Sequence, residues 1–158
     1  HGRTLPGFIG DIGYAQSNRE RYEGFCQALT DAGKKVDSSL CLTTPLGIDT
    51  YREEIDTFLS SLSRMPDAFV CASDYVACIL MQLLEKRGLR VPEDVAVSGF
   101  DNNTEDLLAE HLTTVQVFNE ELGARLALQI LYRIKYPNTP HEVTYLGTNV
   151  LYRDSTGD

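Results

Sequence analysis

The sequence predicts an α/β fold: a doubly wound, mostly parallel sheet with helices on both faces. Short apolar runs alternate with helical patterns along the chain. Runs such as "DAFVCAS" from Asp67 and "VAVSGF" from Val95 are almost continuously apolar. This is typical of parallel strands, because crossover helices cover both faces of their sheet. With 158 residues, 42% of them hydrophobic, the chain is long enough for one compact core.

The first half of the chain predicts two strand–helix units. "PGFIG" from Pro6 is a strand, and Ser17 with Glu20 predicts a capping box that starts a helix ending at Gly33. "KKVDSSLCL" from Lys34 is the second predicted strand. A second capping box, Thr50 with Glu53, predicts a helix that stops before Pro66.

The second half predicts the strand from Asp67, a helix over 74–87, the strand from Val95 and a long helix over 120–136. The segment "EVTYLGTNVLYRDS" from Glu142 is β-rich and predicts an edge strand. The helix over 74–87 carries more apolar residues than one contact stripe needs: Val76, Ile79, Leu80, Met81, Leu83 and Leu84. A homodimer contact is the expected explanation, and burial between the sheet and neighbouring helices is the alternative.

Composition limits the possible partners and cofactors. The net charge is −9, so the surface repels phosphate backbones and these residues are not expected to bind nucleic acid themselves. No stretch is apolar enough over sufficient length to span a bilayer. The four cysteines form no C-x-x-C pair and have no histidine at metal-ligand spacing, which predicts no metal site. Unpaired core cysteines favour a reducing cytoplasm.

Polar side chains follow the predicted strands, where parallel sheets bind ligands. They are Asp11 and Tyr14 after the first strand, Ser73 and Asp74 after the third, Asp101 after the fourth, and Arg21 in the first turn of the first helix. Several of these residues have a structural alternative. Asp74 and Thr104 stand at good helix N-cap positions, Arg21 suits a rim ion pair, and Tyr14 suits an exposed loop.

Enzyme chemistry has little support in the sequence. G-x-S-x-G, the P-loop and G-x-G-x-x-G are all absent. His1, His111 and His141 lie away from the predicted strand ends. A flavodoxin-like enzyme would need a phosphate cradle, and "GDIGYAQSN" lacks the glycines for one. We therefore predict no catalytic residues and no cofactor.

Several stretches, in this order, resemble the effector-binding core of the lactose/galactose-repressor (LacI/GalR) family of bacterial transcription regulators. They are "GFIGD", "SNRERYEGFCQALTDAG", "PDAFVCASDYVACILMQLLEKRGLRVPEDVAVSGFDN", "LTTVQVFNEELGARLALQIL" and "YRDST". The resemblance implies one lobe of a periplasmic-binding-protein-like clamshell. It also implies effector binding by Arg21 of the R-x-x-G-F pattern and by Asp101, with Ser73 and Asp74 lining the cleft. "LTTPLG" lacks the aromatic residue that many relatives place there to stack on the ligand.

The resemblance further implies how the chain is organised. Residues 1–158 are expected to be a fragment of the effector-binding and dimerisation domain, comprising the C-terminal lobe and a crossover helix over 119–136. The DNA-binding domain and most of the N-terminal lobe would lie outside it. A small polar effector, expected to be a sugar, would bind between the lobes and control operator binding allosterically in a cytoplasmic homodimer without membrane contact. The alternative is a periplasmic sugar-binding protein of a transport system.

Overall fold

A parallel four-stranded sheet forms the centre of the molecule. The computed structural model describes residues 2–103 and 107–157. The strands are β1 (Pro6–Ile9), β2 (Cys41–Leu42), β3 (Ala68–Cys71) and β4 (Ala96–Ser98), in the order β2-β1-β3-β4. Every neighbouring pair runs parallel, which confirms the predicted fold class.

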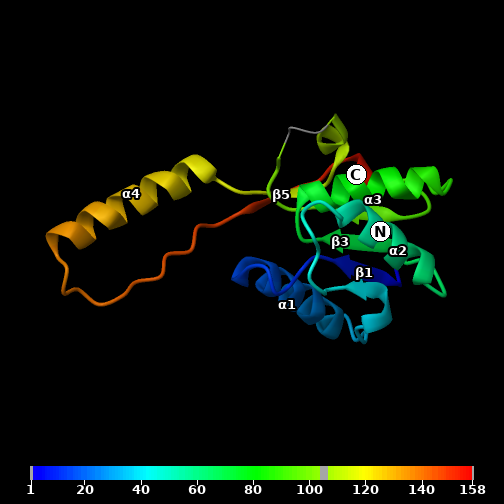
Figure 1. The fold of residues 1–158 in the computed structure, drawn as a ribbon, viewed down its shortest axis with the longest axis horizontal. Helices are drawn as coiled ribbons and strands as arrows, with labels where there is room; N and C mark the ends of the chain where they lie inside the picture. The colour runs from blue at the N-terminus through cyan, green and yellow to red at the C-terminus, as the bar shows by residue number, and fades with distance from the viewer. Residues whose placement is uncertain (1, 104–106, 158) are drawn as a thin grey trace.

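Helices cover both faces of this sheet (Figure 1). They are α1 (Gln16–Asp31) on one face, and α2 (Tyr51–Ser61) with α3 (Asp74–Lys86) on the other. Successive strand residues point to opposite faces, so Phe8 packs with Phe25 and Leu29 of α1, whereas Ile9 belongs to the larger core formed with α2 and α3.

Both predicted capping boxes are wrong. α1 begins one residue before Ser17, with Ala15 at its N-cap and no side-chain cap. The loop ahead of α1 is held instead by Asn18, whose side-chain amide donates to the carbonyl of Asp11 at 2.9 Å. Thr50 does precede α2 without capping it: its hydroxyl donates to the carboxylate of Glu54, one residue beyond the predicted partner. Thr104, the other predicted cap, lies outside the described residues.

The second predicted strand is much shorter than expected. Of its residues, only Cys41 and Leu42 pair with β1, and Ser38–Leu40 forms a 3₁₀ turn. Asp37 causes this turn, because its carboxylate accepts from the backbone N–H of Ser39 at 3.1 Å and from the Ser39 hydroxyl at 2.6 Å. Such local hydrogen bonds compete with an extended backbone.

Two further strands carry the chain away from the sheet. β5 (Thr114–Gln116) lies beside the end of β4, where the N–H groups of Gly99 and Asp101 donate to Thr113 and Val115. Of the strands described here, β6 (Asn149–Leu151) pairs only with β5, antiparallel, which confirms the predicted edge strand over fewer residues.

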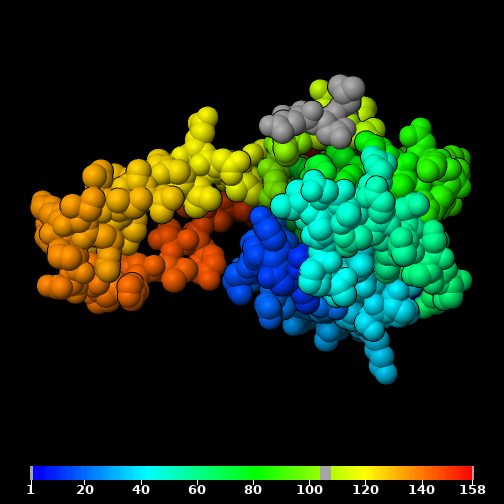
Figure 2. Space-filling model, viewed as in Figure 1, coloured from blue at the N-terminus to red at the C-terminus, as the bar shows by residue number. Residues whose placement is uncertain are grey.

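The segment between β5 and β6, residues 117–148, forms an arm that projects from the body (Figures 1 and 2). It contains α4 (Asn119–Lys135), in which no residue is buried. The apolar side chains of α4 are exposed: Leu122, Leu126, Leu128, Ile130, Leu131 and Ile134. Among the residues that the structure describes, none therefore covers the apolar stripe of α4.

The apolar residues of α3 are, in contrast, used within the monomer. Val76, Ile79, Leu80, Leu83 and Leu84 are all buried, and Met81 packs against the same core. Burial within the monomer thus explains the large number of apolar residues in α3, from which a dimer contact was predicted. Across the described residues, no helix has both the length and the apolar character needed to cross a membrane.

Candidate functional site

The predicted site lies where the strand order reverses. The chain leaves β1 for β2 on one side and returns to β3 on the other, so the carboxyl ends of β1 and β3 border the switch point. Open parallel sheets bind ligands at this position. The guanidinium of Arg21 reaches it from α1 and donates to the carbonyl of Ala72, directly after β3.

Arg21 and Asp101 meet at these carboxyl ends of the strands, called the rim below, although 80 residues separate them in the sequence. Nη2 of Arg21 lies 3.4 Å from Oδ1 of Asp101, and the two side chains are 20% and 42% exposed. The guanidinium also lies over the ring of Phe100, 3.6 Å from its centre, as in a cation–π contact. Both charges are therefore held in place by the protein and still reachable from solvent.

Burial and charge act in opposite directions on this pair. Burial raises the pKa of Asp101 above its ordinary value, while Arg21 lowers it and Asp74 raises it further. Burial also lowers the pKa of Arg21, which Asp101 and Asp74 partly offset. The rim is thus a place where charged groups are short of solvation, so a ligand that supplies hydrogen bonds relieves that cost.

The chain turns sharply after β4, in a conformation that L-residues rarely adopt. Asp101 has φ 113° and Asn102 has φ 53°. Three successive N–H groups hold this corner: Asp101 donates to the carbonyl of Val115 at 3.1 Å, Asn102 to the hydroxyl of Thr114 at 3.2 Å, and Asn103 to the carboxylate of Asp74 at 2.7 Å. Such strain persists where surrounding contacts over-determine it, often at functional sites.

The buried side chain of Asp74 stabilises this turn after β4. It is only 2% exposed, and its two oxygens accept from the Thr114 hydroxyl and from Asn103. Ser73, one residue earlier, is the N-cap of α3 and accepts from the N–H of Val76 at 3.3 Å. Asp74 is therefore neither the predicted cap nor an open ligand contact. Gly99 is required beside it, because a Cβ there would lie 2.2 Å from Oδ1 of Asp74.

The two candidates after β1 have different environments. Asp11 is buried, and its carboxylate accepts from the N–H groups of Gly13, Tyr14 and Leu46, at 2.8, 3.0 and 3.3 Å. It shapes its own loop and joins it to the loop after β2. Tyr14 is 73% exposed, in agreement with its structural alternative, an exposed loop aromatic.

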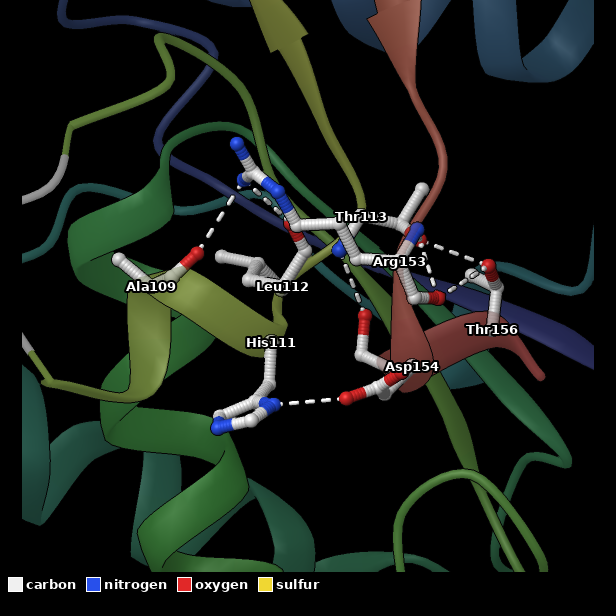
Figure 3. A network of polar contacts seen from close by, with 8 residues as sticks. Ala109, His111, Leu112, Thr113, Arg153, Asp154 and Thr156 are labelled. Carbon is white, nitrogen blue, oxygen red and sulfur yellow. Dashed lines mark hydrogen bonds and ion pairs between the residues drawn. The ribbon is translucent and has the colours of Figure 1, made fainter. Parts of the chain in front are cut away.

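A second polar network behind the rim was not predicted. Oδ1 of Asn102 accepts from Arg153 at 2.7 Å, and its Nδ2 donates to Oε1 of Gln116 at 2.6 Å. Figure 3 shows Arg153 reaching the carbonyls of Ala109 and Leu112 as well. In the sequence, only the closing "YRDST" and the two amides of "GFDNN" pointed to this network, and neither motif shows which residues its side chains contact.

The same region packs tightly around Thr113 and Ser155. The Ser155 hydroxyl donates to the carbonyl of Val97 at 2.6 Å and accepts from the N–H of Thr113 at 2.8 Å. The Thr113 side chain meets the backbone of Arg153 (Figure 3). Across the described residues, no group of three His, Cys, Asp or Glu side chains could hold a metal ion, and no disulfide joins the four cysteines.

Comparison with known proteins gives consistent matches. A family model described as a periplasmic binding protein-like domain matches residues 1–156. The transcriptional regulator DegA of Bacillus subtilis (strain 168) is 35% identical over 117 residues, which are 73% of this chain and 34% of DegA. The regulator CelR of Thermobifida fusca is 34% identical over 142 residues, 86% of this chain and 40% of CelR.

Solved structures of similar fold are also regulators. A complex of the regulator CelR with cellobiose superposes with a TM-score of 0.87 at 29% identity, covering 98% of this chain and 47% of that one. A LacI-family regulator of Sanguibacter keddieii gives 0.84 at 27% identity, covering 99% and 60%. The chain thus spans less than half the length of DegA and of CelR.

Proposed function

The chain belongs to the periplasmic binding protein-like domains of LacI-family transcription regulators, and from this we propose that it is the effector-sensing part of such a regulator. The observation that carries the proposal is the Arg21–Asp101 pair. It brings one donor group and one acceptor group to the switch point of the sheet, from segments 80 residues apart.

The geometry of this pair suits a hydroxyl-rich small molecule. A carboxylate accepts from hydroxyl groups, a guanidinium donates to their oxygens, and such charge-assisted hydrogen bonds are about twice as strong as neutral ones. At 3.4 Å the ion pair itself is long, so little is lost when ligand groups enter between the charges. CelR, which binds cellobiose in its solved complex, supports a sugar as the effector class.

Several properties of the whole protein are part of the same proposal. The effector would lie between this lobe and another lobe, and its preference for one clamshell state would shift operator affinity. DNA would be contacted only by a further domain, since this acidic chain repels phosphate. The protein would be a cytoplasmic homodimer without catalytic activity. The named relatives are regulators, which favours this function over a periplasmic sugar-binding protein.

The test is calorimetry on the full-length protein with cellobiose and a panel of mono- and disaccharides. Arg21→Ala and Asp101→Ala should each weaken binding about tenfold or more, because each removes a charge-assisted hydrogen bond. Arg64→Ala is the matched control. Its guanidinium pairs with Asp37 at 3.1 Å. Asp37 precedes β2 and Arg64 precedes β3, so this pair lies near the amino ends of the strands, away from the Arg21–Asp101 pair at their carboxyl ends.

The control should bind with wild-type affinity. Binding that survives both rim substitutions unchanged would refute the site. A wild-type protein that binds none of the sugars would refute the sugar class.

A further inference from the structure

Asn102 lies between the Arg21–Asp101 pair and the two strands that lead to the arm. It follows Asp101 directly, and its side chain contacts Gln116 in β5 and Arg153, two residues beyond β6. β5 and β6 flank the arm, residues 117–148. A change in the position of Asn102 therefore acts on both strands at once.

The hydrogen bonds of this contact have a defined direction. Arginine only donates, so the amide oxygen of Asn102 must face Arg153. The amide nitrogen then faces Oε1 of Gln116, and the nitrogen of Gln116 donates to the carbonyl of Val117 at 2.9 Å. One relay thus runs from Arg153 through Asn102 and Gln116 to Val117, where the chain leaves β5.

The fixed end of the relay lies in the body. Arg153 also donates to the carbonyls of Leu112 and Ala109, at 2.9 and 3.2 Å (Figure 3). Leu112 and Ala109 are buried. The backbone of Asn102 is held as well: it is left-handed, with φ 53°, and its N–H donates to the Thr114 hydroxyl at 3.2 Å.

We propose that Asn102 is a positioning residue that couples the occupancy of Asp101 to the orientation of β5 and β6, and hence of the arm. This rests on the proposed function in that Asp101 is taken as the effector carboxylate. A ligand that draws Asp101 toward itself rotates the adjacent peptide. Because both ends of the Asn102 amide are engaged, that rotation must be transmitted to Gln116 and Arg153 or break their hydrogen bonds.

The test is hydrogen exchange of the full-length protein, without ligand and with cellobiose or whichever sugar of the panel binds. Asn102→Gly removes the amide but tolerates the left-handed backbone. Amides of β5 and β6 should then exchange about tenfold faster, as expected for the loss of one charge-assisted hydrogen bond. Amides of β1 and β3 should keep their wild-type rates.

Two further variants separate coupling from general weakening. Gln116→Leu removes the other end of the relay, and combining it with Asn102→Gly should add little to either. Asn102→Asp keeps the acceptor for Arg153, so exchange in β6 should stay near wild type. Ile55→Val loosens the buried core below α2, where Ile55 is fully buried, and should accelerate exchange throughout the sheet.

Ligand binding gives the functional readout. In the wild type, the sugar should slow exchange in β5 and β6. In Asn102→Gly, calorimetric affinity should remain within about threefold, as for a residue outside the ligand contact, while this slowing is lost. Loss of sugar binding itself, uniform acceleration, or unchanged exchange in β5 and β6 would each overturn the coupling role. If no sugar binds the wild type, the sugar proposal fails, and ligand-free exchange alone decides whether the relay exists.

Discussion

Oδ1 of Asp74 lies 2.6 Å from the hydroxyl of Thr114, so the first residue of α3 is tied to the strand that leads to the arm. The other oxygen of the same carboxylate holds the N–H of Asn103. One buried carboxylate therefore joins α3, β5 and the strained corner that presents Asp101.

Asp74→Asn should change how stability depends on pH. Burial raises the pKa of Asp74, and the hydrogen bonds from Thr114 and Asn103 only partly oppose this. A raised folded-state pKa contributes stability that is fully present below the unfolded-state value of 3.8 and is lost as pH rises through the folded-state value. The free energy of unfolding of the wild type, relative to Asp74→Asn, should therefore fall as the pH rises above the unfolded-state value of 3.8. Urea titrations of both proteins measure this difference, and a constant difference would contradict it.

Asp67→Asn should show the opposite dependence. Burial alone would raise the pKa of Asp67, but hydrogen bonds from the backbone of Thr4 and Leu5, at 2.6 and 2.8 Å, lower it overall. A lowered folded-state pKa gives stability that is present above the unfolded-state value of 3.8 and lost as pH falls through the folded-state value. The advantage of the wild type over Asp67→Asn should thus grow from acidic to neutral pH in the same titrations. A decline toward neutral pH would exclude this assignment.

Gly99→Ala should destabilise the fold by about 1–3 kcal/mol through overpacking. The new methyl group would lie 2.2 Å from Oδ1 of Asp74 and 2.9 Å from the Leu112 side chain, both buried. Gly24→Ala is the matched control. Gly24 is an exposed residue of α1 with no neighbour within 4 Å of an added methyl group, so the change should stabilise by up to about 1 kcal/mol. Thermal denaturation of both variants checks the contrast, and equal shifts would show that the close approach at Gly99 is unimportant.

Ser155→Ala should cost about 2–3 kcal/mol of unfolding free energy, because the buried N–H of Thr113 and carbonyl of Val97 lose their partner. Ser61→Ala removes an exposed hydroxyl that donates to the carbonyl of Phe58, and should change stability by less than about 0.5 kcal/mol. Urea denaturation compares the two. A near-zero cost for Ser155→Ala would mean that water replaces the hydroxyl.

The prediction from sequence was most successful for elements with strong local patterns. The apolar runs at 68–71 and 96–98 are parallel strands, and Gly33 ends α1 with φ 68°. Helix starts were less well predicted. Ser17 and Thr50 carry the residue types of N-caps, but their side chains make no cap in this fold. The rim pair of Arg21 and Asp101 does come together, whereas Asp74 turned inward.

The layers of this domain follow from the order of its amino acids alone, because the periodicity of apolar residues dictates which faces must be buried. It also marked the polar strand ends, since parallel strands bring their carboxyl ends to one edge. Which of those groups faces solvent, and which supports the turn after β4, depends on how the folded chain packs. Hydrogen bonds such as Asp74–Thr114 and Asn102–Arg153 join residues 40 and 51 positions apart. Their existence depends on how strands pair in space, which no local pattern encodes.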